Sequence, residues 1–205
     1  MVGNAIASKL VELGYEVKMG SRTANNEKAL AWLKGKGGGA SEGSFADAAA
    51  FGEILFNCTV GAASLEALKL AGSRNLRGKI LIDVANPLDF SQGMPPSLTV
   101  CNKDSLAEQI QRSFPEARVV KALNTMNCTV MVNPAIVPGD HTVFVSGNDA
   151  KAKTEVTKIL NQFGWKNVID LGDITSARGT EMLLALWLRL MAVLQTTNFN
   201  FIIAK

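Results

Sequence analysis

The chain has 205 residues, of which 47% are hydrophobic and 19% are charged. This balance is typical of a buried α/β sheet and far from that of a disordered chain, and the length suits a single domain over residues 1–205. The net charge of +3 is small, and the Lys and Arg residues are scattered without interleaved aromatic residues. We therefore expect no nucleic-acid partner.

Cysteine and histidine are too sparse for an ordinary zinc site. Cys58, Cys101 and Cys128 are far apart in the sequence and form no C-x-x-C motif, and the chain has one histidine. No signal peptide is visible, and the longest apolar run, 182–194, is interrupted by Arg189 and too short to cross a bilayer. We expect a cytoplasmic, soluble protein without bound metal or membrane contact.

Helical spacing opens the chain. Val2, Ile6 and Leu10 recur on one helical face, and Gly14 is a natural stop for the helix. The segments that follow predict a strand over 15–20, a helix over 25–34, a flexible glycine-rich loop over 35–39 and a short helix over 45–51. The chain thus begins with a helix that runs directly into a strand.

From residue 53 onward, aliphatic runs alternate with helical patterns. Strands are predicted over 53–60, 79–84, 118–123, 142–146 and 168–171, and helices over 64–70, 105–114 and 150–163. Continuous apolar strands that alternate with helices are typical of a parallel sheet covered on both faces. The predicted fold class is α/β: a Rossmann-like, doubly wound, mainly parallel sheet with helices on both faces.

A helix is predicted over 180–195, inside a C-terminal helical extension that spans 174–205. It is apolar on nearly every side, and a helix without a polar face must be covered all round. We expect it to pack against the sheet edge on one side and against a partner subunit or a wall of the substrate site on the other. A homodimer through this helix is the expected assembly.

The strand over 15–20 ends in Ser21, Arg22 and Thr23. In nucleotide-binding α/β sheets, the tip of the second strand faces the adenosine ribose, and a carboxylate there selects NAD by repelling a 2′-phosphate. Two hydroxyls and a guanidinium suit a phosphate dianion instead. The segment predicts NADP as the cofactor, and the alternative is a polar turn with a solvated arginine and a helix cap at Thr23.

Polar residues follow three more of the predicted strands, where the ligand crevice of a doubly wound sheet lies. The backbone of Thr59 and Val60 is expected against the cofactor, and a simple strand-to-helix turn is the alternative. Asn86, which precedes Pro87, is expected to hold the nicotinamide ribose or carboxamide, and an Asx-type turn is its alternative. Asn124 places a further polar group at the crevice.

Six short segments carry a family resemblance. They are Met1-Val2-Gly3, Gly20-Ser21-Arg22, Asp83-Val84-Ala85-Asn86-Pro87-Leu88, Val120-Lys121-Ala122-Leu123-Asn124-Thr125, Val145-Ser146-Gly147 and Ala177-Arg178-Gly179-Thr180-Glu181. In this order they resemble the NADP oxidoreductases that use a deazaflavin coenzyme, over essentially the whole chain. The resemblance extends to the cytosolic domain of the six-transmembrane ferric reductases. It implies that the corner at Asn124 faces the nicotinamide ring and the hydride acceptor.

The sequence departs from the family pattern at its start. The pattern opens with G-x-G-x-V-G, of which only the third glycine has a counterpart, Gly3, and the preceding strand has none. In a sheet of order 3-2-1-4-5 that strand is central, so its neighbours lack a partner and the pyrophosphate loop is unmade. An internal methionine start or a truncation explains the missing strand and glycines. If the chain really begins here, helix amides at Gly3 and Asn4 still favour an anion.

The resemblance implies an NADP-dependent oxidoreductase that transfers a hydride between NADP(H) and a deazaflavin, flavin or similar small-molecule acceptor, with activity impaired by any truncation. The alternative is a non-catalytic NADP(H)-binding redox sensor or accessory subunit. No catalytic side chain is predicted, because hydride transfer between rings needs no protein proton. Cys128 is expected to be an inert buried thiol and His141 a structural residue. Arg178 and Glu181 are expected to pair with each other, cap the last helix or shape the acceptor site.

Overall fold

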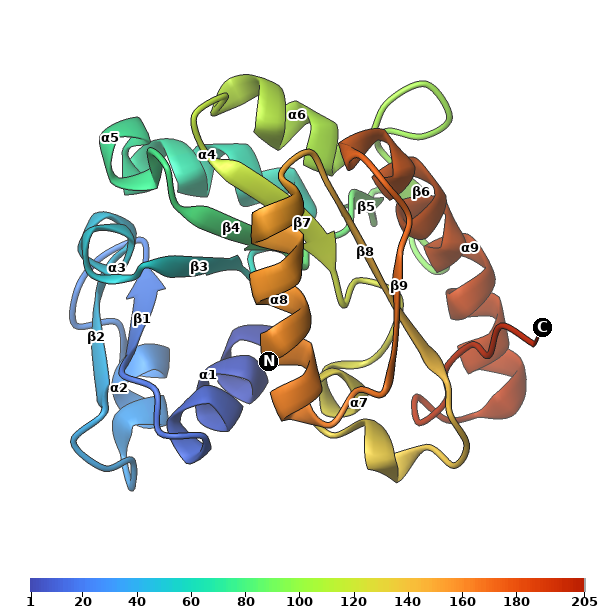
Figure 1. Cartoon of the computed structure of the whole chain (residues 1–205), viewed down its shortest axis with the longest axis horizontal. Helices are drawn as coiled ribbons and strands as arrows, with labels where there is room; N and C mark the ends of the chain where they lie inside the picture. The colour runs from blue at the N-terminus through green and yellow to red at the C-terminus, as the bar shows by residue number, and fades with distance from the viewer. Residues whose placement is uncertain (205) are drawn as a thin grey trace.

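The structure, a computed structural model, describes residues 1–204 and contains two neighbouring, mainly parallel sheets (Figure 1). In the smaller sheet, β1 (Val17–Ser21) pairs with β2 (Ala40–Ser44). The larger sheet has the order β3-β4-β7-β8-β9, with bounds Ile54–Asn57, Ile80–Asp83, Arg118–Ala122, Thr142–Gly147 and Asn167–Asp170. Its neighbouring strands are parallel except β7 and β8. This is the mainly parallel α/β sheet that the sequence predicts.

Helices cover both faces of the larger sheet. One face packs against α1 (Val2–Glu12), α7 (Cys128–Val132) and α8 (Ala150–Phe163). The other packs against α3 (Phe45–Phe51), α4 (Gly61–Ala71), α5 (Ser73–Leu76) and α6 (Leu106–Ser113). The remaining elements are α2 (Glu27–Leu33), the short hairpin of β5 (Leu88–Asp89) and β6 (Ser97–Leu98), the 3-10 helices η1 (Pro134–Ile136) and η2 (Ile174–Ser176), and α9 (Ala177–Leu194).

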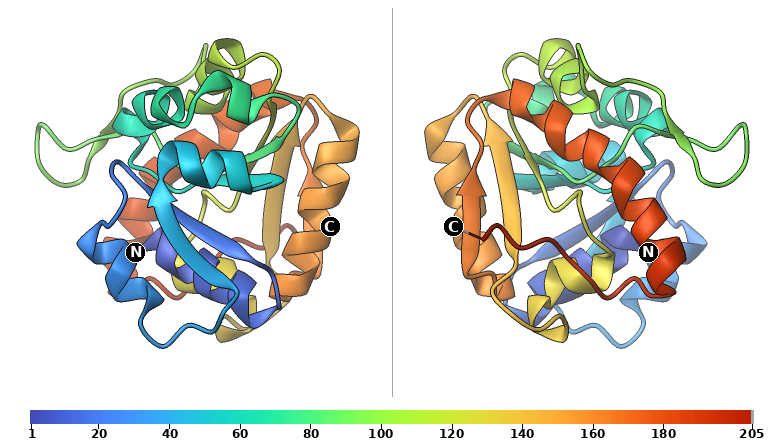
Figure 2. Two further views of the ribbon diagram at one scale, coloured as in Figure 1. Left: turned by 90° about the vertical axis from the view of Figure 1, so that its left-hand side faces the viewer. Right: turned by 90° about the vertical axis from the view of Figure 1, so that its right-hand side faces the viewer.

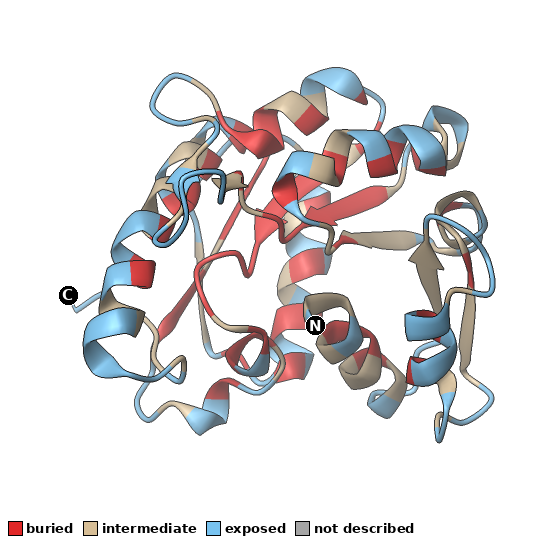
Figure 3. Cartoon of the chain, turned by 180° about the vertical axis from the view of Figure 1, so that it is seen from behind, coloured by how far each residue is buried: buried red, intermediate tan, exposed pale blue. Residues whose placement is uncertain are grey.

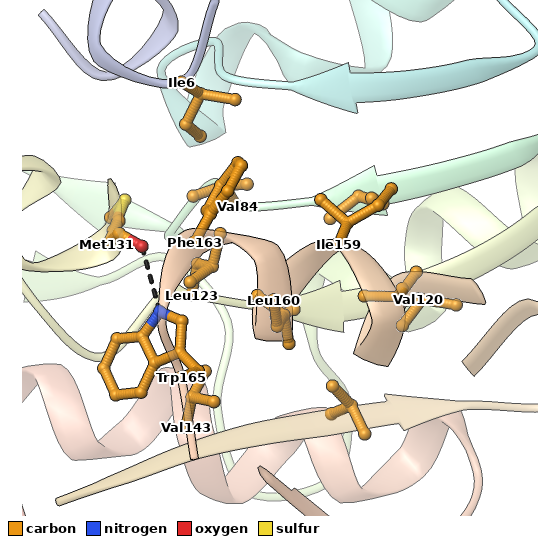
Figure 4. Packing of buried hydrophobic residues seen from close by; sticks show 14 of the residues in the cluster. Ile6, Val84, Val120, Leu123, Met131, Val143, Ile159, Leu160, Phe163 and Trp165 are labelled. Carbon is orange, nitrogen blue, oxygen red and sulfur yellow. Dashed lines mark hydrogen bonds between the residues drawn. The ribbon is translucent and has the colours of Figure 1, made fainter. Parts of the chain in front are cut away.

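The core divides according to the alternation of side chains along the strands. Ile80 and Ile82 of β4 join the cluster on the α1 and α8 side, whereas Leu81 between them joins the cluster on the α4 and α6 side. Figure 4 shows the first cluster, in which the Trp165 indole Nε1 donates to the Met131 carbonyl oxygen at 2.9 Å. Burial on both faces explains why these strands are continuously apolar.

Helix α8 is capped at both ends. The Asp149 side chain caps it by accepting from the Ala152 amide, and Gly164 ends it in the left-handed conformation at φ 104°. Its stripe of Val156, Ile159, Leu160 and Phe163 is buried against the sheet. The helix predicted over 150–163 is therefore confirmed.

Strand β2 was not predicted. Its sequence, Ala-Ser-Glu-Gly-Ser, has low strand propensity and follows a glycine-rich loop, so nothing local marks it. It forms because each of its residues pairs with a residue of β1, from Val17 with Ala40 to Ser21 with Ser44. Tertiary pairing overrides the local preference here.

Helix α9 lies at the end of the molecule opposite β1 and β2, as Figures 1 and 2 show. On its inner side the Trp187 ring stacks on Phe199, with ring centroids 5.1 Å apart. On its outer side, Leu186, Val193 and Leu194 are exposed, and the exposed face is visible in Figure 3. The described chain therefore covers only part of this apolar helix. Within residues 1–204, no helix has the length and apolar character needed to cross a membrane.

Candidate nucleotide-binding site

The candidate site lies where parallel strands end. Strands β1, β3 and β4 run parallel to their neighbours, and each leads at its carboxyl end into a loop that the sequence singles out. The first turn of α1 reaches the same region, because a Cβ on Gly3 would lie 3.5 Å from the Cβ of Cys58 and 3.9 Å from the Met19 sulfur. The structure thus brings the opening helix beside the ends of β1 and β3.

The turn after β1 leaves one cation free. The Ser21 hydroxyl donates to the Thr23 carbonyl oxygen at 2.7 Å, which shapes the turn locally. Arg22 is exposed, and within residues 1–204 its guanidinium has no hydrogen-bond or ion-pair partner. The cap of α2 is Asn26, which accepts from the Lys28 amide, so the alternative of a helix cap at Thr23 does not hold. The cation is available to an anion in solution.

The first turn of α1 has unused backbone donors. Met1 is the N-cap and provides no side-chain hydrogen bond, and the first turn contains no acidic residue. The amides of Gly3 and Asn4 therefore remain open at the positive end of an eleven-residue helix. They fit a phosphate group better than any neutral ligand.

Thr59 belongs to a polar network under the loop between β3 and α4. Its hydroxyl donates to Asn57 Oδ1 at 2.7 Å and lies 2.9 Å from the Ser64 hydroxyl, while Asn57 Nδ2 donates to Asp83 Oδ1 at 2.8 Å. The side chain of Thr59 is thus used within the protein. Val60, the N-cap of α4, is exposed at the crevice.

Gly61 allows the loops after β3 and β4 to touch, which sequence reasoning missed. A Cβ at this position would overlap the Asn86 carbonyl oxygen and lie 3.0 Å from the Pro87 Cα. Any other residue would push the Asn86 loop away. The only sequence signal was a glycine directly after a buried strand.

Asn86 and Asn124 form a reciprocal pair across two loops. Asn86 Nδ2 donates to the Asn124 carbonyl oxygen at 2.8 Å, and Asn124 Nδ2 donates to Asn86 Oδ1 at 2.9 Å and to the Thr180 carbonyl oxygen at 3.0 Å. The preceding residue, Leu123, is buried and has φ 62°, which is unusual for a branched side chain. The pairing holds the strand ends of β4 and β7 and the start of α9 together.

A buried ion cluster supports this corner. Lys121 Nζ lies 2.8 Å from Asp83 Oδ2 and 2.8 Å from Glu181 Oε1, and all three side chains are almost fully buried. Burial lowers the pKa of Lys121, but the two carboxylates outweigh this effect and raise the pKa above its ordinary value. Glu181 also accepts from the amides of Leu106 and Ala107, at the start of α6. The lysine thus joins the sheet, α6 and α9.

Arg178 does not pair with Glu181. Its guanidinium forms a two-point ion pair with Glu108, at 2.9 Å from Nε to Oε2. Arg178 holds the pKa of Glu108 below its usual range, chiefly through this hydrogen bond. The sequence places Arg178 and Glu181 on one helix, but the fold gives each a partner on a distant element.

The remaining titratable candidates are structural. Burial raises the pKa of the Cys58 thiol to about 12, so the thiol stays protonated at neutral pH. Cys128 is buried. The imidazole of His141 is buried between the Pro134 carbonyl oxygen and the Asn200 side chain. Within residues 1–204, no cluster of His, Cys, Asp and Glu is arranged to hold a metal ion.

Comparisons with known proteins agree with this arrangement. Residues 1–87 match the model of the family described as "NADP oxidoreductase coenzyme F420-dependent". The chain is 54% identical to a candidate F420-dependent NADP reductase of known structure from Arthrobacter sp. FB24, with a TM-score of 0.95 over 100% of this chain and 95% of the other.

Two curated relatives are more distant. The chain is 32% identical over 107 residues to the F420-dependent NADP reductase of Methanocaldococcus jannaschii, which covers 52% of this chain and 48% of the relative. It is 29% identical over 179 residues to the metalloreductase STEAP3 of Rattus norvegicus, over 86% of this chain and 33% of the relative. The chain therefore spans about half or less of the length of these two.

The fold and the strand-end site define a Rossmann-like dinucleotide-binding protein, as the sequence predicts. The chain belongs to the family of coenzyme F420-dependent NADP oxidoreductases. Because F420 is a deazaflavin, the resemblance drawn from the six segments is confirmed.

Proposed function

We propose that this chain binds NADP(H) and catalyses hydride transfer between the nicotinamide and the deazaflavin F420. The observation that carries the proposal is Arg22, an unpartnered guanidinium at the carboxyl end of β1 within residues 1–204. A free cation flanked by two hydroxyls at that strand tip suits the 2′-phosphate that distinguishes NADP from NAD. The names of the family and of two relatives support F420 as the partner.

In this proposal the chain binds and orients NADP(H) and F420, and these two molecules supply the reactive atoms. Arg22, with Ser21 and Thr23, holds the 2′-phosphate, and the amides of Gly3 and Asn4 face the diphosphate. The Asn86 and Asn124 pair, with Thr59, Val60 and Pro87 beside it, lines the nicotinamide end. When bound, the nicotinamide C4 provides the hydride. Proximity and exclusion of water account for the acceleration, so no side chain has to transfer a proton.

Turnover tests the proposal directly. The purified chain is mixed with NADPH and F420, and the loss of NADPH absorbance is followed against a reaction without protein. Protein-dependent oxidation of NADPH supports the proposal, and the same chain with NADH is expected to react more slowly. If NADPH binds but no turnover occurs with F420, the chain is instead a nucleotide-binding module.

One observation favours this second candidate, a non-catalytic redox sensor or accessory subunit that binds NADP(H). Strands β1 and β3 are not paired with each other, so the sheet is divided beside the diphosphate position. A divided sheet weakens the positioning that hydride transfer needs, while the 2′-phosphate contacts at Arg22 are unaffected. The turnover experiment separates the two candidates.

We also propose that the chain forms a homodimer through α9. The exposed side chains of Leu186, Val193 and Leu194 give this helix an apolar outer face. Light scattering on the purified chain should give a dimer mass, and Val193→Glu should shift it toward the monomer. A monomer mass for the unmodified chain would refute the dimer.

A further inference from the structure

The turn that carries Arg22 is held by a carboxylate from the neighbouring strand. The Asn25 amide donates to Glu42, whose Oε1 and Oε2 both lie 3.1 Å from the amide nitrogen. Glu42 is in the middle of β2, where it pairs with Met19 of β1. Asn25 has φ 59°, and the next residue, Asn26, is the N-cap of α2. The carboxylate therefore holds the point at which the chain passes from β1 into α2 (Figure 1).

The rest of this turn makes few hydrogen bonds. Within residues 1–204, the backbone amides of Arg22, Thr23 and Ala24 donate to no protein group. The Ser21 hydroxyl donates to the Thr23 carbonyl oxygen, which shapes the turn without connecting it to β2. Among the described residues, the bond from Asn25 is thus the one hydrogen bond that ties residues 22–25 to β2.

The two charged side chains at this turn are used differently. Glu42 is half-buried and accepts from the backbone with both of its oxygens, whereas Arg22 is exposed. In the described part of the chain, no carboxylate lies within ion-pair distance of Arg22, so Glu42 does not neutralise it. An acidic residue at the tip of β1 itself would repel a 2′-phosphate. Glu42, on the adjacent strand, holds the backbone and leaves the guanidinium available.

We propose that Glu42 is a positioning residue for NADP(H) selectivity: through the Asn25 amide, it keeps the turn in the shape that presents Arg22 to the 2′-phosphate. The inference rests on the proposed function, in which Arg22 binds that phosphate. A loop that is already ordered loses less conformational entropy when its ligand binds, so the ligand binds more tightly. Because Glu42 acts through Arg22, it favours NADPH over NADH.

Titration of the purified full chain with NADPH and with NADH tests the proposal. Glu42→Ala removes the acceptor of the Asn25 amide, and we expect it to weaken NADPH binding by about threefold to tenfold and to leave NADH binding unchanged. Glu42→Gln keeps one side-chain oxygen for that amide and should retain most of the affinity for NADPH. The matched control is Glu27→Ala, which removes an exposed carboxylate from the first turn of α2 and should weaken neither nucleotide.

A double-mutant cycle separates positioning from a general effect on folding. In the Arg22→Ala background, Glu42→Ala should cause no further loss of NADPH affinity, because the cation that it positions is already absent. The same loss in that background, equal weakening of NADPH and NADH, or an equal loss in Glu42→Gln overturns the proposal. Unchanged or tighter NADPH binding by Glu42→Ala also overturns it, since the carboxylate would then act only as a repelling charge.

Hydrogen exchange without nucleotide gives a second readout. In Glu42→Ala the Asn25 amide should exchange several-fold faster, whereas the Val17 amide, which donates to the Gly39 carbonyl oxygen at the start of the small sheet, should be unchanged. An unchanged Asn25 rate overturns the proposal, and faster exchange at both amides does so too, because the pairing of β1 with β2 is then lost. Failure of the proposed function is recognised separately: Arg22→Ala would then leave the ratio of NADPH to NADH affinity unchanged.

Discussion

Gly61 and Asn86 meet so closely that the Asn86 carbonyl oxygen occupies the position of a side chain on Gly61. The contact joins the loop after β3 to the loop after β4, at the proposed nicotinamide end of the site. The two residues are brought together by the parallel pairing of β3 with β4.

Gly61→Ala should therefore destabilise the protein and disturb the site. The new methyl group must displace the Asn86 backbone, which costs about 1–3 kcal/mol by analogy with overpacked cores. Chemical denaturation measures the loss. The matched control is Gly179→Ala in α9, where a Cβ meets nothing within 4 Å; it should be neutral or stabilising by up to about 1 kcal/mol. Equal effects of the two substitutions would contradict this account.

Arg22→Ala should weaken NADPH binding far more than NADH binding. A hydrogen bond to a charged group contributes about 1.5–3 kcal/mol, which corresponds to roughly a tenfold to hundredfold loss of affinity for NADPH. Titration of the purified chain with each nucleotide measures the ratio. Lys28→Ala, which removes an exposed cation from α2, serves as the control and should change neither affinity. Equal weakening of both nucleotides by Arg22→Ala would exclude the 2′-phosphate contact.

Lys121→Met should be among the most destabilising substitutions in the chain. It leaves the carboxylates of Asp83 and Glu181 buried without their cation, and removal of one partner from a buried ion pair costs about 3–5 kcal/mol. Unfolding in urea measures this loss. Adding Glu181→Gln to Lys121→Met should cost less than the sum of the two single effects, because the residues share one network. Additive losses would show that Lys121 acts independently of Glu181.

Stability should fall in acid partly through Asp104. Its hydrogen bond from Arg112 lowers the pKa of the Asp104 carboxyl to about 2, below an unfolded value of about 3.9. The contribution is therefore complete above pH ~4 and is lost as the pH falls through ~2. The effect should be of the order of 1 kcal/mol or less, since Arg112 is largely exposed and water screens the pair. Thermal unfolding of Asp104→Asn should show a weaker dependence on pH in this window, and an unchanged dependence would rule out this carboxyl.

The helices and buried strands could be predicted because their signals are local. The stripe of α8 and its ending at Gly164 follow from residue spacing alone. Strand β2 has no such signal, since its polar and glycine residues become a strand only by pairing with β1. Local patterns thus account for elements that bury their own apolar face and fail for a strand defined by its neighbour.

The candidate site likewise has residues whose role the sequence predicts and residues whose partners it does not predict. Arg22 lies just after a predicted strand in the sequence, so its proposed role could be stated from the sequence. The partners of Glu181 could not, because Lys121 lies sixty residues away in sequence and meets Glu181 only in the folded chain. Arg178 likewise finds Glu108 rather than its helical neighbour.

The sequence by itself determined the α/β class, the family and the strand-end residues, because periodicity and short motifs depend on neighbours within a few positions. Only the tertiary structure decided which loops touch at Gly61 and which ions pair around Lys121. These features depend on residues far apart in the chain. Their energies arise from burial and pairing after the sheet has assembled.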